Sequence, residues 1–117
     1  MKFVLRDEVT MEYEKQWGPI PENNEMDKLI PLLCKAGIPF DLAIHMGRPQ
    51  IIYPSIEEKV CDAVLHWGSY GREQGLLEIM GLCDADDDVE GWLTAEEVFD
   101  RILAHYLDHY KKNQKTS

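Results

Sequence analysis

This sequence has few cysteines, few positive charges and no long apolar run. The three cysteines, at positions 34, 61 and 83, are odd in number and include no CxxC pair, which disfavours a disulfide framework and fits a reducing compartment. No stretch approaches the roughly 20 apolar residues that a membrane-spanning helix needs. Near the start, Arg6, Asp7 and Glu8 stand where a signal peptide carries its apolar core. We therefore expect a cytoplasmic protein.

Positive charge is scarce, with 12 Lys and Arg against 22 Asp and Glu, a formal net charge of -10. Phosphate backbones and anionic lipids repel such a surface, so direct binding to nucleic acid or to a membrane is disfavoured. Three interpretations remain: solubility, attraction to a basic protein partner, or mimicry of nucleic acid. No GxSxG, P-loop or dinucleotide fingerprint occurs. We expect no catalytic residues and no enzyme.

The length of 117 residues predicts one domain over 1–117. Residues 1–23 form an N-terminal segment whose conformation the pattern leaves open. Residues 24–112 are expected to form a helix–sheet–helix core, and 113–117 a frayed tail. The first helix should begin after a cap at Asn24 and end at Gly37. Pro31 should kink that helix or move its start to Asp27.

Four apolar segments follow, over 40–45, 50–54, 59–67 and 76–80, and each is typical of a strand. The last element is a helix over 95–110, where Thr94 and Glu97 have the spacing of a capping box. Grouped strands flanked by helices indicate an α+β fold. We expect a four-stranded antiparallel meander, flanked by an N-terminal and a C-terminal helix packed on one face. Asp62 and His66 share a strand face and suggest an exposed polar site.

The stretch DDDVEGWLTAEE, residues 86–97, resembles an EF-hand calcium loop. Its carboxylate ligands would be Asp86, Asp88, Glu90 and Glu97, with the Trp92 carbonyl and a sharp turn at Gly91. An EF-hand needs an entering helix, which would cover 75–85 with Gly81 in its interior, where glycine is unfavourable by about 1 kcal/mol. The same residues also suit a solvated loop leading into a capped helix, and both interpretations stay open.

The segment GSYGREQGLLEIMG, followed by an acidic spacer and GWLTAEEVFDRI, resembles small acidic proteins encoded in phages and prophages of gut Firmicutes. The resemblance covers roughly residues 25–105 and implies a setting, without a mechanism. Small acidic phage proteins often bind host proteins, including nucleic-acid-binding ones, and inhibitors of CRISPR nucleases are examples.

The favoured hypothesis is a non-enzymatic acidic interaction module of phage or prophage origin, without a cofactor. It would bind a host or phage protein and could inhibit a nucleic-acid-binding protein. Its contact surface would be the 84–92 loop together with the exposed sheet face. The loop residues are Asp84, Asp86, Asp87, Asp88, Glu90 and Trp92. The alternative is a single EF-hand-like calcium site formed by Asp86, Asp88, Glu90 and Glu97.

Overall fold

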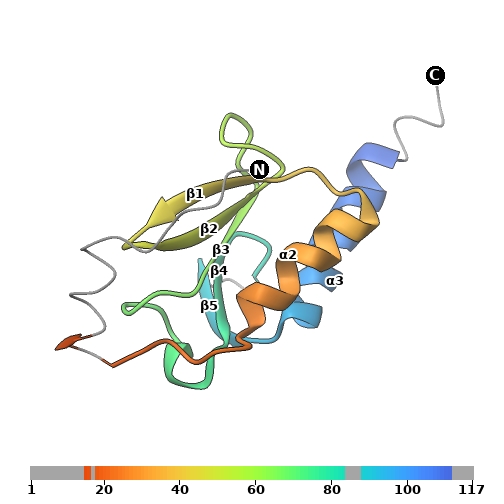
Figure 1. Ribbon diagram of the computed structural model, residues 1–117. Coiled ribbons are helices and arrows are strands. Elements are labelled where there is room, and N and C mark those ends of the chain that lie inside the picture. The colour runs from red at the N-terminus through yellow and green to blue at the C-terminus, as the bar shows by residue number, and fades with distance from the viewer. Residues whose placement is uncertain (1–14, 17, 84–87, 112–117) are drawn as a thin grey trace.

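The computed structural model describes residues 15–16, 18–83 and 88–111. Within these residues one antiparallel sheet has the strand order β1-β2-β3-β4-β5, so each strand pairs with its neighbour in the chain (Figure 1). The strands are β1 (Asp41–His45), β2 (Arg48–Tyr53), β3 (Cys61–Val64), β4 (Leu77–Met80) and β5 (Val89–Leu93). The α+β class and the meander are confirmed.

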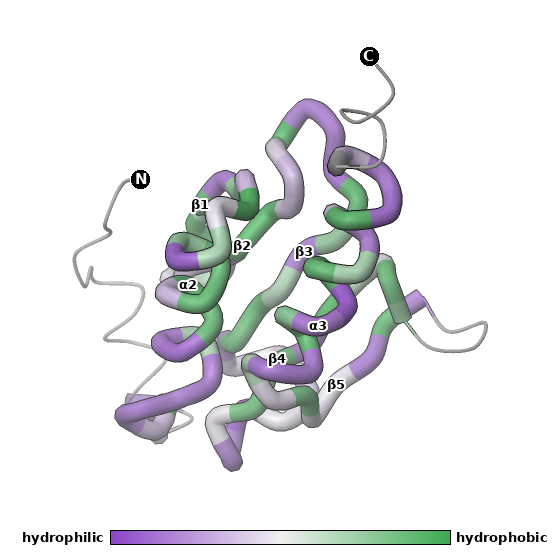
Figure 2. Tube along the Cα trace, turned by 90° about the vertical axis from the view of Figure 1, so that its right-hand side faces the viewer, coloured by the Kyte–Doolittle hydropathy of each residue, from purple (hydrophilic) through white to green (hydrophobic). Residues whose placement is uncertain are grey.

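Two helices, α2 (Glu25–Ala36) and α3 (Ala95–Tyr106), lie side by side and cover one face of the sheet. A π-helical turn, η2 (Leu107–Lys111), continues α3. The core between the layers takes apolar side chains from both. Those from the helices are Leu29, Leu33, Val98 and Ile102, and those from the sheet include Ile51, Ala63 and Ile79. Figure 2 shows the alternation of hydrophobic and hydrophilic segments along both helices that this arrangement requires.

The helix ends follow the predicted signals. The Asn24 side chain accepts a hydrogen bond from the Asp27 backbone N–H at 3.1 Å, and Gly37 ends α2 with φ of 71°. Pro31 lies inside α2 and does not move its start, which is Glu25. The capping box of α3 is complete, because Thr94 and Glu97 each bond to the other's backbone N–H. These local caps fix where both helices begin.

The two helices are also tied together at their first turns. The Glu25 carboxylate at the start of α2 accepts a hydrogen bond of 2.9 Å from the Ala95 backbone N–H at the start of α3. It also forms an ion pair of 2.7 Å with Lys28. A carboxylate is favourable at a helix N-terminus, where backbone N–H groups lack partners. None of the helices in the described part of the chain is long and apolar enough to cross a membrane.

The sheet has one strand more than predicted. Residues 89–93 form β5, paired with β4, where the sequence pattern indicated only an acidic loop. The strand escaped detection because its apolar residues do not alternate: Val89 and Leu93 are separated by Glu90, Gly91 and Trp92. A register shift within the β4–β5 pair explains this irregular spacing.

The face of the sheet away from the helices is not the open polar surface that was expected. Ile52, Asp62 and Val64 alternate with the core residues of β2 and β3 and therefore point away from the helices, yet all three are buried. Asp62 is 4% exposed, and its carboxylate accepts from the Gln50 amide at 2.8 Å and pairs with Lys59 at 2.8 Å. His66 is 7% exposed. The prediction of an exposed Asp62–His66 site was wrong.

Candidate functional site

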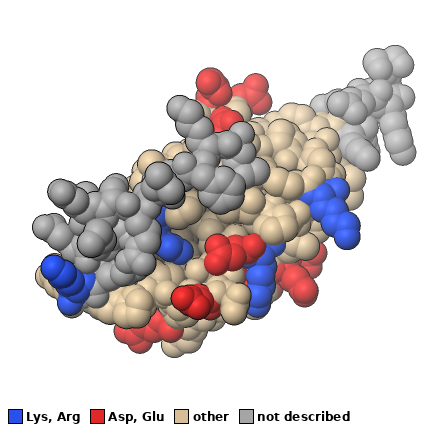
Figure 3. Space-filling model, viewed as in Figure 1, with Lys and Arg blue, Asp and Glu red and all other residues tan. Residues whose placement is uncertain are grey.

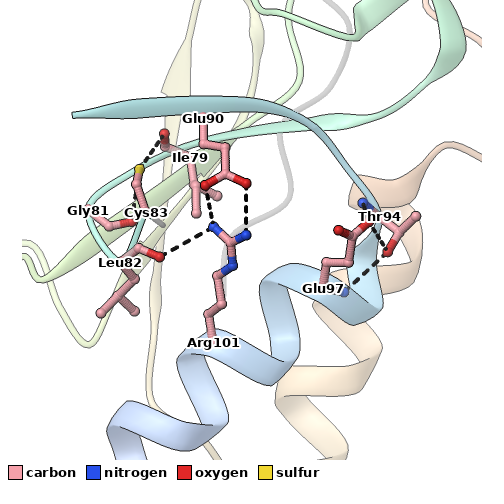
Figure 4. Close-up of polar contacts among 8 residues, drawn as sticks. All are labelled: Ile79, Gly81, Leu82, Cys83, Glu90, Thr94, Glu97 and Arg101. Atoms are coloured by element: carbon pink, nitrogen blue, oxygen red, sulfur yellow. Dashed lines mark hydrogen bonds and ion pairs between the residues drawn. The ribbon is translucent and has the colours of Figure 1, made fainter. Parts of the chain in front are cut away.

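The predicted contact residues are distributed along β5 and the segment before it. Asp84, Asp86 and Asp87 lie outside the described residues. Asp88 is exposed at the start of β5. Glu90, one of the proposed contact and calcium residues, points into the molecule toward α3 (Figure 4). Trp92 lies near the opposite end of β5 from Asp88. The structure therefore separates Trp92 from the described carboxylates of the loop.

Arg101 on α3 contacts the chain on both sides of the acidic segment. Its two terminal nitrogens each donate to one oxygen of Glu90 at 2.8 Å, and one of them also donates to the Leu82 carbonyl at 3.4 Å. Such a paired contact uses the planar geometry of the guanidinium and gives stronger hydrogen bonds than neutral groups do. Leu82 follows β4 and Glu90 lies in β5, so a single side chain fixes the entry to and the exit from this segment (Figure 4).

The geometry does not suit an EF-hand loop. Residues 77–80, where the entering helix should lie, form strand β4. Of the four carboxylates assigned to calcium, Glu90 is bound to Arg101 and Glu97 accepts from the Thr94 N–H at 3.1 Å. Over the described residues, no three Asp, Glu, His or Cys side chains form a group that could hold a metal ion. Glu90 and Glu97 are thus engaged by separate partners and do not converge on one point.

A bulge in β5 determines where Trp92 points. Leu93 pairs with Leu77 and Glu90 pairs with Ile79, so three residue steps on β5 oppose two steps on β4. In a regular strand, residues three apart would point to opposite faces. The extra residue at the bulge allows both Glu90 and Leu93 to face the helix layer. The irregular backbone of the bulge is at Trp92, whose φ of 57° lies in the left-handed region that a bulky residue rarely occupies.

Trp92 stacks on Tyr70 and both rings remain open to solvent. The ring centroids are 5.3 Å apart with an interplanar angle of 22°, and each side chain is 57% exposed. The backbone fits this contact closely, since a Cβ on Gly91 would lie 2.3 Å from the Tyr70 Cβ. The Trp92 N–H also donates to the Tyr70 carbonyl at 3.4 Å. The exposed aromatic pair is thus built by the fold and requires glycine at position 91.

The two rings border an open cleft with a volume of about 480 Å³. Residues 67–69 and 71–74 form the rest of its lining, including the short 3₁₀ turn η1 (Arg72–Gln74). This turn is closed by the Leu76 N–H, which donates to the Gly71 carbonyl at 3.0 Å. It is joined to α2 because the Glu25 N–H donates to the Gly75 carbonyl at 2.9 Å. The cleft therefore has a wall fixed to the helix layer. We call it the Tyr70–Trp92 cleft.

His66 supports the turn from which Tyr70 projects. Its Nδ1 accepts a hydrogen bond from the Gly68 N–H at 3.0 Å, and its backbone N–H donates to the Ser69 hydroxyl at 3.0 Å. Burial, with a smaller contribution from His45, lowers the pKa of His66 to about 4. A neutral imidazole can accept at Nδ1, whereas a protonated one cannot. The turn thus depends on a neutral His66.

Comparison with protein-family models, curated proteins and solved structures gives no match to this chain. The candidate site therefore rests on its own geometry.

In the view of Figure 3, acidic side chains gather at the top, whereas acidic and basic side chains are mixed over the lower part of this face. The Tyr70–Trp92 cleft combines an open volume with two exposed aromatic rings, and we take it as the candidate contact site. Trp92 was among the predicted contact residues, but Tyr70 was not. Two exposed aromatic residues far apart in the sequence give no local signal that they meet. The only hint was the glycine-rich spacing around Tyr70, which is typical of a turn.

Proposed function

We propose that this chain is a non-enzymatic acidic module that binds a protein partner through the Tyr70–Trp92 cleft. The observation that carries the proposal is the conformation of Trp92, which lies at a strand bulge with φ of 57° and is 57% exposed. Backbone outliers of this kind cost about 1–3 kcal/mol and occur preferentially at functional sites, as bulges also do.

The energetics favour an interface. Tryptophan and tyrosine are the residues most enriched among interface hot spots, where they fill desolvated pockets. Covering the exposed parts of the two rings would remove roughly 200 Å² of largely apolar surface from water, worth about 5 kcal/mol before the costs of association. That is enough for the pair to dominate the affinity of a complex of ordinary size.

The charge of the chain bears on the kind of partner. A net charge of -10 favours a basic protein surface and slows the approach of nucleic acid or of an anionic membrane. We propose a cytoplasmic phage or prophage setting in which the partner is a host or phage protein, including the case of an inhibited nucleic-acid-binding protein. The module would work without a cofactor.

Partner capture from host lysate on the immobilised chain tests this proposal. Trp92→Gly removes the ring and suits the left-handed backbone, so the variant should fold. Ile56→Ser is the matched control, because Ile56 is 59% exposed in the β2–β3 loop, at the other end of the sheet from Tyr70. A specific partner should be lost at least tenfold with Trp92→Gly and retained with Ile56→Ser. Equal capture by the wild type and Trp92→Gly would contradict the proposal.

A further inference from the structure

The open faces of the Tyr70–Trp92 stack suit a flat ligand group. The two rings lie nearly parallel, with an interplanar angle of 22°, so they offer broad π surfaces. Aromatic faces carry partial negative charge and attract cations that lie within about 6 Å of the ring centre. A planar cation can both stack on such a face and be attracted by it.

The charged groups beside the stack favour a cation as well. The Glu78 carboxylate accepts a hydrogen bond from the Tyr70 N–H at 3.1 Å, which places a negative charge next to the ring pair. Glu73, whose side chain is 77% exposed, lies on the cleft wall 3.9 Å from the Arg72 guanidinium. One carboxylate and one guanidinium thus lie on the cleft wall, a second carboxylate lies beside Tyr70, and the overall charge of the chain is -10.

Arginine is the side chain that combines planarity with positive charge. Its guanidinium is weakly hydrated, stacks on aromatic rings and donates hydrogen bonds sideways while stacked. Glu73 and the Gln74 amide on the cleft wall provide acceptors for those donors. The lysine ammonium is a compact and strongly hydrated charge without a flat face. The cleft should therefore bind arginine more tightly than lysine, although the two side chains carry the same charge.

We propose that the Tyr70–Trp92 cleft binds an arginine side chain on an extended basic segment of the partner. This inference rests on the proposed function and specifies the chemistry of the partner at the same site. The arginine stacks on the open face of the ring pair, and its guanidinium hydrogen-bonds to Glu73. The remaining basic residues of the segment are attracted by the overall negative charge.

Two peptides of equal length and charge test the proposal on the full chain. One carries arginine and the other lysine at the same glycine-spaced positions. Binding to each variant is measured by isothermal titration calorimetry, and in the wild type the shift of the Trp92 indole N–H signal in nitrogen-15 spectra, assigned with Trp92→Phe, locates the site. We expect the arginine peptide to bind at least about threefold more tightly than the lysine peptide. Trp92→Gly should bring this ratio close to one, and Ile56→Ser should leave it unchanged.

Glu73→Gln, which keeps the size of the side chain, should weaken binding of the arginine peptide about twofold or more and leave the chain folded. Equal affinity for the two peptides would overturn the inference, as would an arginine preference that survives in Trp92→Gly. Tighter binding of a glutamate peptide, or of a neutral oligosaccharide, would overturn it too. If the peptides are not distinguished but lysate capture still depends on Trp92, the inference fails and the proposed function stands.

Discussion

Replacing Arg101 by methionine should remove the contacts that join α3 to Glu90 in β5 and to Leu82 after β4, and so lower the stability of the whole domain. Methionine keeps most of the length of the side chain but removes both hydrogen bonds to Glu90 and the one to Leu82. The Arg101 and Glu90 side chains are only 18% and 26% exposed, so the loss should lie between the values for an exposed and a buried ion pair. We expect about 2 kcal/mol, or about 8 °C in melting temperature for a chain of this length.

Urea unfolding of a double-mutant cycle measures the contact itself. Glu90→Gln should cost about 1 kcal/mol alone and almost nothing in the Arg101→Met background, which gives a coupling energy of about 1 kcal/mol. Lys28→Met is the control, because the Lys28 side chain that pairs with Glu25 is 59% exposed, against 18% for Arg101, and its loss should cost less than about 0.5 kcal/mol. If the Arg101 and Glu90 effects simply add, or Arg101→Met is no worse than Lys28→Met, the anchoring role assigned to Arg101 is wrong.

Four further results are expected. Gly81→Ala should lower the free energy of unfolding by at least about 3 kcal/mol in urea, since the new Cβ would lie 2.2 Å from the Val60 carbonyl oxygen and the backbone φ is 86°. Gly68→Ala is the control and should change this free energy little, because no atom lies nearer than 3.4 Å to its Cβ. Thr94→Ala should lower the free energy of unfolding by about 1 kcal/mol through loss of the α3 cap, seen as an earlier urea midpoint. The pKa of His66 is about 4 in the folded chain and near 6.5 in the unfolded chain, so stability should fall as the pH drops from about 6.5 toward 4. His66→Gln should flatten this part of the plot of urea midpoint against pH. Calcium should leave the melting temperature unchanged, whereas a concentration-dependent rise would restore the EF-hand hypothesis.

The parts of the fold that follow from neighbouring residues were predictable. Asn24, Gly37 and the Thr94–Glu97 pair act within one helical turn, so their spacing in the sequence is enough to locate the helix ends. The first four strands also have regular apolar patterns, and Leu77–Met80 is extended as expected. What depends on side chains within one turn or one strand could be inferred without the structure.

The parts that depend on distant partners could not be inferred. The role of Glu90 is set by Arg101, on a different element, and a carboxylate in an acidic stretch looks the same whether it binds calcium, water or a guanidinium. Trp92 meets Tyr70 only because the β5 bulge changes its direction. Asp62 is buried although its strand position suggested a solvent-facing side chain. To predict the role of each of these residues, one must know which side chains pack against it.

The strand order has a consequence for how the chain reaches its native state. Each strand hydrogen-bonds to the strand next to it in the chain, so the sheet can grow hairpin by hairpin with short loops to close. The contact between α2 and α3 instead joins distant parts of the chain, since Glu25 and Ala95 are 70 positions apart. Contacts of such long range are slow to form, because the entropy of the intervening chain opposes them. We expect the meander to assemble early and the helix pair to close over it late, so substitutions at the Glu25–Ala95 contact should accelerate unfolding more than they slow folding.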